Sequence, residues 1–185
     1  MTKGAPLFGS EIIQLLVPHR RPFLMVDAVD AFDRDAHSLR AHRMISANED
    51  VFAGHFPGLN LWPGVYTIEG LGQSCLLLAI LQRFDEPTLA ALTNLQRGYR
   101  LDPAYRPAAA IDLGPASARM GVGAAVDVEL VAPVFAGQCL EYRVRRTHVV
   151  GDLTRFDVEA LVDARTVARG VMTGKSNVLV PDVLP

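Results

Sequence analysis

The sequence predicts an α+β fold in which one long buried helix is wrapped by an antiparallel β-sheet. Residues 63–83 suit a single helix about 30 Å long, at 1.5 Å per residue. Only Glu69 and Gln73 are strongly polar in its first four turns, and a helix that is apolar nearly all round is buried. Later in the chain, apolar and polar residues alternate with the period of a strand. Together these patterns predict a helix layer packed on a sheet layer.

The N-terminal elements are predicted from local signals. Residues 12–17 suit a short apolar helix with Ser10 as its N-cap, and the prolines that follow end it. Residues 23–29 and 38–45 are predicted strands, joined by a polar turn at residues 33–36. This part of the chain therefore supplies one short helix and two strands of the sheet.

The C-terminal strands are predicted from their alternation. Residues 140–145 and 156–162 each alternate apolar with mostly polar side chains, and Gly151-Asp152 between them suits a two-residue hairpin turn. Residues 165–179 supply a further strand. These segments complete the predicted antiparallel sheet.

The length suits one domain, since domains commonly hold about 100–200 residues. We expect a single domain over residues 1–185, with residues 85–124 as an insertion or flap within it. This segment is rich in Ala, Pro and Arg and predicts short helical pieces at best, such as residues 88–95. Its few large apolar groups cannot bury an independent core.

Composition and charge argue against several classes of protein. Lys plus Arg is 18 and Asp plus Glu is 20, a net charge of −2, whereas nucleic-acid binding favours a strong positive excess. The longest strongly apolar stretch, residues 70–82, is shorter than the roughly 18–20 residues that span a bilayer. Residues 1–10 lack the apolar run of a signal peptide. Cys75 and Cys139 are expected to be free thiols in a reducing compartment. We therefore expect a cytoplasmic protein that binds neither nucleic acid nor membrane.

Two titratable residues stand out for their surroundings. His55 lies in a Gly-His-Phe-Pro-Gly loop, and Glu69 follows fourteen residues later inside the apolar helix. Burial disfavours the charged form of a carboxyl, so a buried Glu can hold and donate a proton, while a histidine can accept one. An acid and a base in different environments suit an elimination. Each residue alone is also compatible with a structural role, as a loop hydrogen bonder or a paired core carboxylate.

The backbone at the start of the long helix offers a third group. The N–H of Gly64 has no acceptor within the helix and points out of its N-terminus. This end carries a partial positive charge, so a carbonyl placed there would be polarised as negative charge develops on it. Glycine also lets a ligand approach the backbone closely.

Several short motifs occur in order along the chain: LVPHRRPFLMVD at 16–27, GHFPG at 54–58, PGV at 63–65, IEGLGQ at 68–73 and PVFAG at 133–137. They resemble the motifs of the 3-hydroxyacyl-[acyl carrier protein] dehydratases of fatty-acid synthesis. The fourteen-residue spacing between the candidate base and acid also matches that family. The resemblance covers roughly residues 10–83 and 125–175.

The resemblance implies a hotdog fold, a homodimer or trimer of dimers, and a tunnel for an acyl chain on the phosphopantetheine arm of an acyl carrier protein. His55 would take the α-proton, and Glu69 of the neighbouring subunit would protonate the departing hydroxyl. The family needs no metal or redox cofactor, because the thioester already eases α-deprotonation. The residues expected to bind substrate or hold the acid are Gly64, Phe56, Pro63, Val65 and Gln73.

Alternatives remain at this stage. A hotdog thioesterase, a catalytically silent hotdog subunit and a hydratase acting on coenzyme A thioesters share the predicted fold. Trp62, Ala132 and the long segment 85–124 depart from the family's usual pattern. These departures leave the acyl chain length, the pathway and carrier docking open. Isomerase activity is less expected, because the related isomerising group has Asp at the position of Glu69.

Overall fold

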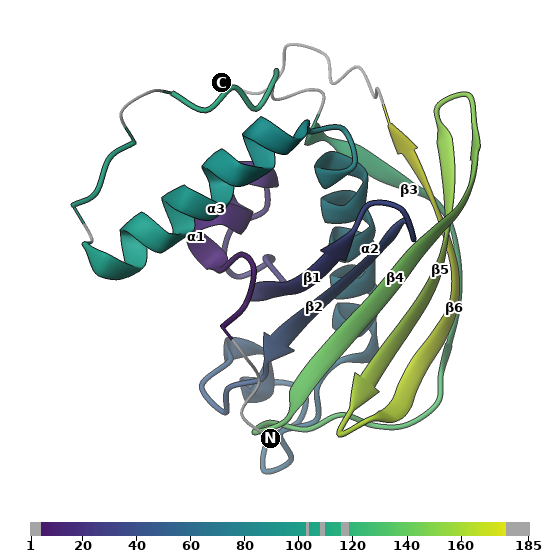
Figure 1. Cartoon of the computed structure of the whole chain (residues 1–185). Helices are drawn as coiled ribbons and strands as arrows, with labels where there is room; N and C mark the ends of the chain where they lie inside the picture. Colours follow the sequence, from purple (N-terminus) through teal and green to yellow (C-terminus); the bar gives the residue numbers. More distant parts are fainter. Residues whose placement is uncertain (1–4, 103, 108–109, 116–118, 177–185) are drawn as a thin grey trace, which may run out of the picture.

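The computed structural model describes residues 5–102, 104–107, 110–115 and 119–176. Within them, the central helix α2 (Gly64–Leu81) is wrapped by a six-stranded antiparallel sheet with the strand order β1-β2-β4-β5-β6-β3 (Figure 1). Helices α1 (Ser10–Leu16) and α3 (Glu86–Leu101) lie beside α2, on the side that β4, β5 and β6 leave open (Figure 1). The strands are β1 (Ala28–Asp33), β2 (Ser38–Met44), β3 (Gly121–Leu130), β4 (Cys139–Val150), β5 (Leu153–Val162) and β6 (Arg165–Ser176).

The central helix forms where the sequence predicted it. It begins one residue later than expected, because Pro63 is its N-cap (φ −61°, ψ 128°) rather than its first helical residue. Gly70 lets α2 pack closely on β4: a Cβ added there would lie 2.1 Å from the hydroxyl oxygen of buried Tyr142. By length and composition alone α2 could cross a membrane, but 56% of it is buried inside the protein. Its place within the sheet therefore accounts for its apolar character.

The predicted alternation of the C-terminal strands is confirmed. β4 and β5 pair across the predicted turn at residues 151–152, and β2 closely matches the predicted strand 38–45. β6 covers most of the predicted strand 165–179, whose last three residues lie outside the described ranges. The side chains that alternate toward the interior are nearly fully buried, with 4% exposure or less: Leu140, Tyr142, Val144, Phe156, Val158 and Ala160.

Two N-terminal predictions are wrong in detail. β1 begins at Ala28, whereas the sequence predicted a strand from residue 23. Residues 23–27 have no regular secondary structure, because side chains of α2 and β2 take up much of their backbone hydrogen bonding. In α1, Gly9 is the N-cap and makes no side-chain cap bond, so Ser10 is the first helical residue instead.

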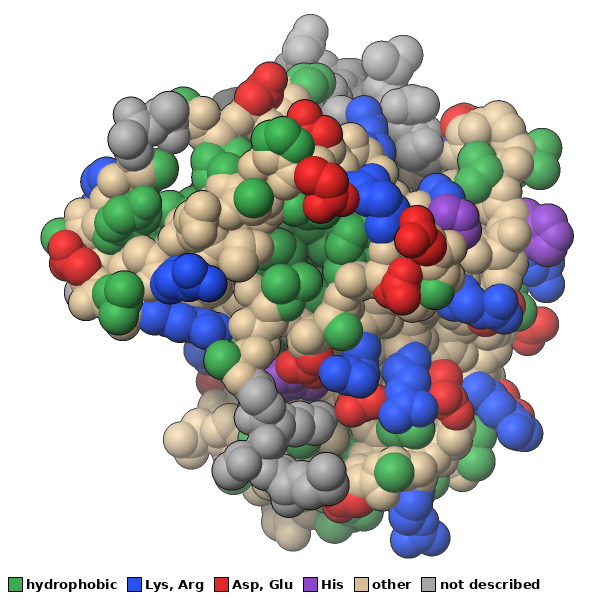
Figure 2. All heavy atoms as spheres, viewed as in Figure 1, with side chains coloured by type: hydrophobic (Ala, Val, Ile, Leu, Met, Phe, Trp, Pro, Cys, Tyr) green, Lys and Arg blue, Asp and Glu red, His purple; other side chains and the backbone are tan. Residues whose placement is uncertain are grey.

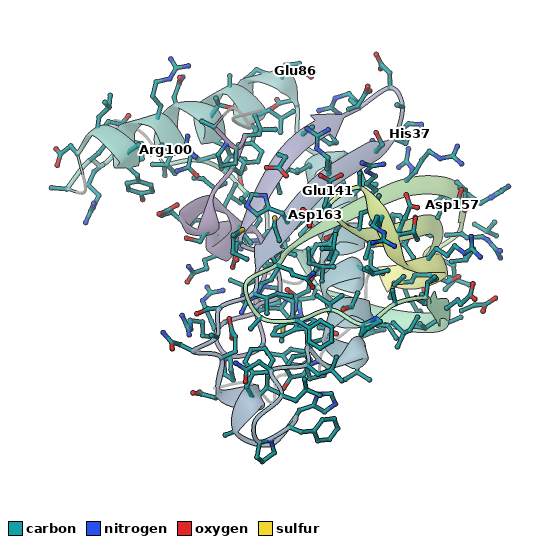
Figure 3. All side chains as sticks on the ribbon, turned by 90° about the horizontal axis from the view of Figure 1, so that it is seen from below. His37, Glu86, Arg100, Glu141, Asp157 and Asp163 are labelled. Carbon is teal, nitrogen blue, oxygen red and sulfur yellow. The ribbon has the colours of Figure 1, made fainter. Side chains whose placement is uncertain are left out.

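Residues 85–124 hold a longer helix than the sequence predicted. α3 has 16 residues. Asp85 is its N-cap and accepts a hydrogen bond from Thr88 N at 2.9 Å. Leu92 and Leu95 of α3 are buried, and α3 packs against α1. Glu86 and Arg100 lie near its two ends (Figure 3).

The edge strand β3 was not predicted. Nine of its ten residues are exposed and the tenth is intermediate, although Val126, Val128 and Leu130 alternate with Asp127 and Glu129 as in a strand. Among the described residues it pairs with β6 alone, which leaves its other side open. β3 therefore ends the sheet opposite β1.

Candidate active site

The candidate base is held in a loop that follows the short 3-10 helix η1 (Asp50–Ala53). The backbone N–H of His55 donates to Val51 O at 2.9 Å, and its ring Nδ1 lies 2.9 Å from Leu61 O. A carbonyl oxygen only accepts, so Nδ1 must carry the hydrogen of this bond. In the neutral ring Nε2 then has its lone pair free to accept a proton.

The same loop is tied to the segment before β4. Trp62 N donates to Val134 O at 2.8 Å, and Leu61 and Phe135 form an isolated antiparallel bridge. Trp62 is 3% exposed and packs on Phe52. The imidazole is thus carried on a loop with both of its ends fixed.

Four further predicted residues lie beside His55 or at the start of α2. The ring of Phe56 stacks on that of His55, with their centroids 4.3 Å apart, and the peptide bond between them is cis. Pro63 is buried, while Val65 is 65% exposed. A Cβ on Gly64 would lie 2.3 Å from a methyl of Leu130 in β3, so this glycine also lets β3 approach α2.

Gln73 fixes the orientation of the candidate acid. Its Oε1 accepts from Met25 N at 2.8 Å, and its Nε2 donates to Phe23 O at 2.7 Å. These two backbone groups determine which way the amide points. Nε2 therefore also donates to Glu69 Oε1, at 2.8 Å, as its position one turn later predicted. The side chain of Glu69 is 30% exposed, more than its apolar helix led us to expect.

His19 is a site residue that was not among the predicted ones. Its Nε2 lies 3.7 Å from Glu69 Oε1, and its Nδ1 is buried without a hydrogen-bond partner. Burial lowers the pKa of His19, against the opposite effect of the Glu69 carboxylate. The sequence signal that could have indicated His19 is its place in the motif at residues 16–27. The motif alone does not show that this segment contacts α2.

A cavity of about 420 Å³ lies between α2 and strands β3, β5 and β6. Its walls are mainly apolar, and its titratable lining residues are His19, Glu69, Cys75 and Lys175. Burial raises the pKa of the Cys75 thiol, which keeps it protonated and a poor nucleophile. The acid therefore faces a space suited to an apolar ligand.

The described chain gathers the predicted residues into two groups. Glu69 and Gln73 line the cavity, together with His19. His55, Phe56 and the start of α2 form the second group, and no residue from 54–65 is among those that line the cavity. Among the described residues, no three His, Cys, Asp or Glu side chains are grouped so as to hold a metal ion.

Comparison with known sequences identifies the family. A family model described as a FabA-like domain matches residues 17–98. The 3-hydroxyacyl-[acyl-carrier-protein] dehydratase FabZ of an Anaeromyxobacter species is 46% identical over 166 residues, covering 89% of this chain and 87% of that protein. FabZ of a Nitratiruptor species is 32% identical, covering 84% and 88%. The chain belongs to the 3-hydroxyacyl-[acyl-carrier-protein] dehydratase family.

Other relatives in this dehydratase family are matched over less of their length. FabZ of Chlamydia trachomatis is 39% identical over 94 residues, which are 50% of this chain. The chain spans about three fifths of the length of these chlamydial relatives. The predicted resemblance is nonetheless confirmed by the longer alignments.

Solved structures confirm the hotdog fold. The dehydratase heterocomplex ApeI:P from Xenorhabdus doucetiae matches with a TM-score of 0.53 and 13% identity, covering 89% of this chain and 90% of that one. A hypothetical thioesterase with coenzyme A from Streptococcus pneumoniae matches with a TM-score of 0.51 and 10% identity, covering 80% and 83%. Since one is named a dehydratase and the other a thioesterase, the fold does not decide between these activities.

Proposed function

We propose that this protein removes water from 3-hydroxyacyl thioesters on an acyl carrier protein, giving trans-2-enoyl thioesters in fatty-acid or related lipid or polyketide synthesis. The observation that carries the proposal is 46% identity to a FabZ dehydratase over 89% of the chain. The site geometry supports it independently. Its two groups offer a base with a free ring nitrogen and a carboxyl that faces an apolar cavity.

Each group has a defined role in the elimination. His55 Nε2 takes the proton from the carbon next to the thioester carbonyl, and the electron pair of that C–H bond forms the new double bond. The hydroxyl leaves from the next carbon with a proton from Glu69, as water. Gly64 N–H, at the positive end of α2, polarises the thioester carbonyl while charge develops on its oxygen.

The remaining predicted residues orient substrate and acid. Gln73 occupies Glu69 Oε1, which leaves Oε2 for the hydroxyl. Phe56 holds the ring of His55, and Pro63 and Val65 flank the backbone that would receive the thioester. The apolar cavity would take the acyl chain, since its walls offer mainly hydrophobic contacts. The chemistry needs no cofactor beyond the carrier's phosphopantetheine arm.

A homodimer would bring the two groups together. The free side of β3 leaves N–H and C=O groups unpaired, which is a template for another strand. Val122, Val126 and Leu130 on β3 are each about half exposed, and Val65 lies exposed on neighbouring α2. A second copy related by a twofold axis would cover this surface and bring its own His55 to the Glu69 cavity. Such dimers could further assemble as a trimer of dimers.

The carrier protein is the proposed partner, in the cytoplasm. Two arginines of the outer sheet face are paired with acids: Arg143 Nε lies 2.7 Å from Glu141 Oε1, and Arg145 Nη2 lies 2.6 Å from Asp157 Oδ2. On the face shown in Figure 2, blue and red side chains are likewise interleaved. This pattern favours carrier docking elsewhere, near the start of α2 where the thioester must enter.

The test is incubation with 3-hydroxyacyl thioesters of several chain lengths, each on carrier protein and on coenzyme A. We expect loss of one water from the carrier-bound substrates, detected by mass, and no release of free thiol. Release of free thiol would favour a thioesterase, and turnover of coenzyme A substrates alone would favour the hydratase alternative. No change in any substrate would contradict the proposed function.

A further inference from the structure

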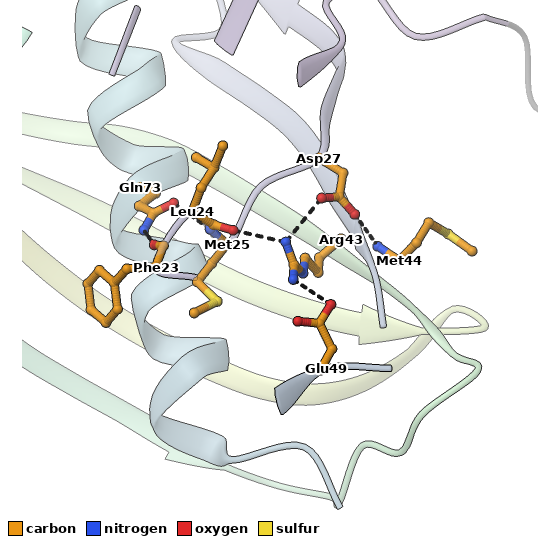
Figure 4. A network of polar contacts seen from close by, with 8 residues as sticks. All are labelled: Phe23, Leu24, Met25, Asp27, Arg43, Met44, Glu49 and Gln73. Carbon is orange, nitrogen blue, oxygen red and sulfur yellow. Dashed lines mark hydrogen bonds and ion pairs between the residues drawn. The ribbon is translucent and has the colours of Figure 1, made fainter. Parts of the chain in front are cut away.

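Residues 23–27 lie against Gln73, the residue that binds the candidate acid, and are held by two side chains from different elements (Figure 4). Gln73 of α2 binds the backbone of Phe23 and Met25, as described above. Arg43 of β2 binds the carbonyl of Leu24 between them, with Nη1 at 2.9 Å. The segment that fixes the Glu69–Gln73 pair is thus anchored from both sides.

The guanidinium of Arg43 is buried and has several partners. Its side chain is 9% exposed, and Nη1 also lies 3.1 Å from Asp27 Oδ1. Asp27 is itself fixed, because its Oδ2 accepts from Met44 N at 2.8 Å. Nη2 donates to Glu49 Oε1 at 2.7 Å. One planar group therefore holds three carbonyl or carboxylate acceptors in a set geometry.

Two contacts of Arg43 connect it to the loop that carries the candidate base. Glu49 is the N-cap residue of the short helix η1. Val51 of this helix accepts, through its carbonyl oxygen, the hydrogen bond from the backbone N–H of His55. The guanidinium also lies over the ring of Trp62, 5.7 Å from its centroid, and Trp62 comes directly before the N-cap of α2. Arg43 therefore touches the segments on either side of the His55 loop.

We propose that Arg43 is a positioning residue, which holds the His55 loop and the segment behind Glu69 in a fixed relation. This role rests on the proposed dehydration. Arg43 is absent from the residues that line the cavity, so it acts through the residues it holds and not on the acyl chain. If the site is shared by two chains, each Arg43 supports the base of one site and the acid of the other.

The chain offers a matched control at the other end of α2. Arg34 also donates to backbone carbonyls, to Gln82 O at 3.1 Å and to Phe84 O at 2.5 Å. Its Nε also lies 3.3 Å from Glu86 Oε1, and its guanidinium carbon lies 5.8 Å from the centroid of the Phe32 ring. None of these groups contacts the residues assigned to the chemistry, so Arg34 tests the loss of a similar network away from the site.

The experiment compares Arg43→Lys with Arg34→Lys. Lysine keeps the charge but loses the planar fork, so only some of the contacts can be kept. Rates are measured on a carrier-bound substrate well below the lowest melting temperature of the three proteins. For Arg43→Lys we expect kcat to fall by about 10–100-fold, since small misplacements of reacting groups cost up to roughly 10²-fold. KM should change little, and Arg34→Lys should keep the wild-type kcat.

A second variant keeps the test decisive if Arg43→Lys does not fold. Glu49→Gln removes one charged partner and preserves the shape of the side chain; it should also lower kcat with little change in KM. Where all variants fold, the double variant should lose less than the product of the two single losses, because both act through one network.

Wild-type kcat in the folded Arg43→Lys protein would overturn the role, as would an equal loss in Arg34→Lys. If Arg43→Lys does not fold, wild-type kcat in Glu49→Gln would overturn it. A wild-type protein that dehydrates no substrate would instead overturn the proposed function on which the role rests.

Discussion

The two ends of α2 are held by similar contacts in different surroundings. Near its start, Arg43 lies over the buried ring of Trp62 and binds Glu49, whose side chain is 17% exposed. Near its end, Arg34 lies over Phe32 and binds Glu86, whose side chain is 80% exposed. A buried ion pair is costly to break, because the group left behind stays desolvated, whereas an exposed pair contributes little. The same chemistry thus gives a rigid end beside the candidate site and a tolerant end away from it.

The largest expected difference between the two ends is in catalysis. Glu69→Gln should lower kcat by about 10²–10⁴-fold, the usual contribution of general acid catalysis, because the amide keeps the shape but has no acidic proton. The matched control is Glu86→Gln, which removes an exposed carboxyl at the far end and should leave kcat unchanged. Both are measured as water loss from a carrier-bound substrate. Near-wild-type turnover by Glu69→Gln would remove the role assigned to this residue.

The cost of adding a methyl group should also be larger in α2, next to the candidate site, than in α3, away from it. Gly70→Ala places a methyl against the fully buried Tyr142 and should destabilise the fold by about 1–3 kcal/mol, the usual cost of overpacking. Gly98→Ala in α3 meets Tyr105, which is only partly buried and can move aside. Both substitutions gain roughly 1 kcal/mol in helix propensity, which should offset much of the smaller packing cost at Gly98. Urea unfolding measures both, and equal effects would show that the two sites are equally tolerant.

The smallest expected effect concerns pH. Burial lowers the pKa of His19 below the value of 6.5 that it has in the unfolded chain. As pH falls through 6.5, the unfolded chain takes up a proton before the folded protein does, so the folded protein loses stability. This penalty is absent well above that pH. His19→Gln cannot bind the proton, so its melting temperature should fall less than that of the wild type between about pH 7.5 and about pH 5.5.

The control for this pH effect is His148→Gln, because His148 is exposed on β4 and is not among the residues of the candidate site. Its melting temperature should fall as much as that of the wild type over the same range. An identical fall in all three proteins would show that His19 is not desolvated in the folded state.

Side-chain patterns predicted the elements that are buried either on one face or nearly all round. α2, β4 and β5 were found because burial imposes a pattern on their side chains. β3 was missed although Val126, Val128 and Leu130 alternate with acidic residues, because its first half is rich in Gly and Ala and none of its residues is buried. α3 could have been found from Asp85 and Thr88, which form its cap, and from the spacing of Leu92 and Leu95.

The site was predicted where its residues are close in sequence. Gln73 lies one turn from Glu69, so their contact follows from helix geometry. His19 and Arg43 depend on contacts between segments far apart along the chain, which no local pattern specifies. The roles of His55 and Glu69 stay predictions.

The central claim is that one active site takes His55 and Glu69 from two chains. His55→Ala and Glu69→Gln should each be nearly inactive as separate homodimers. Co-expressed, they form mixed dimers in which one site collects both substitutions and the other collects neither. With random mixing, about half of the dimers are mixed, so roughly a quarter of the wild-type activity should return. Co-assembled chains that stay as inactive as either parent would contradict the shared site.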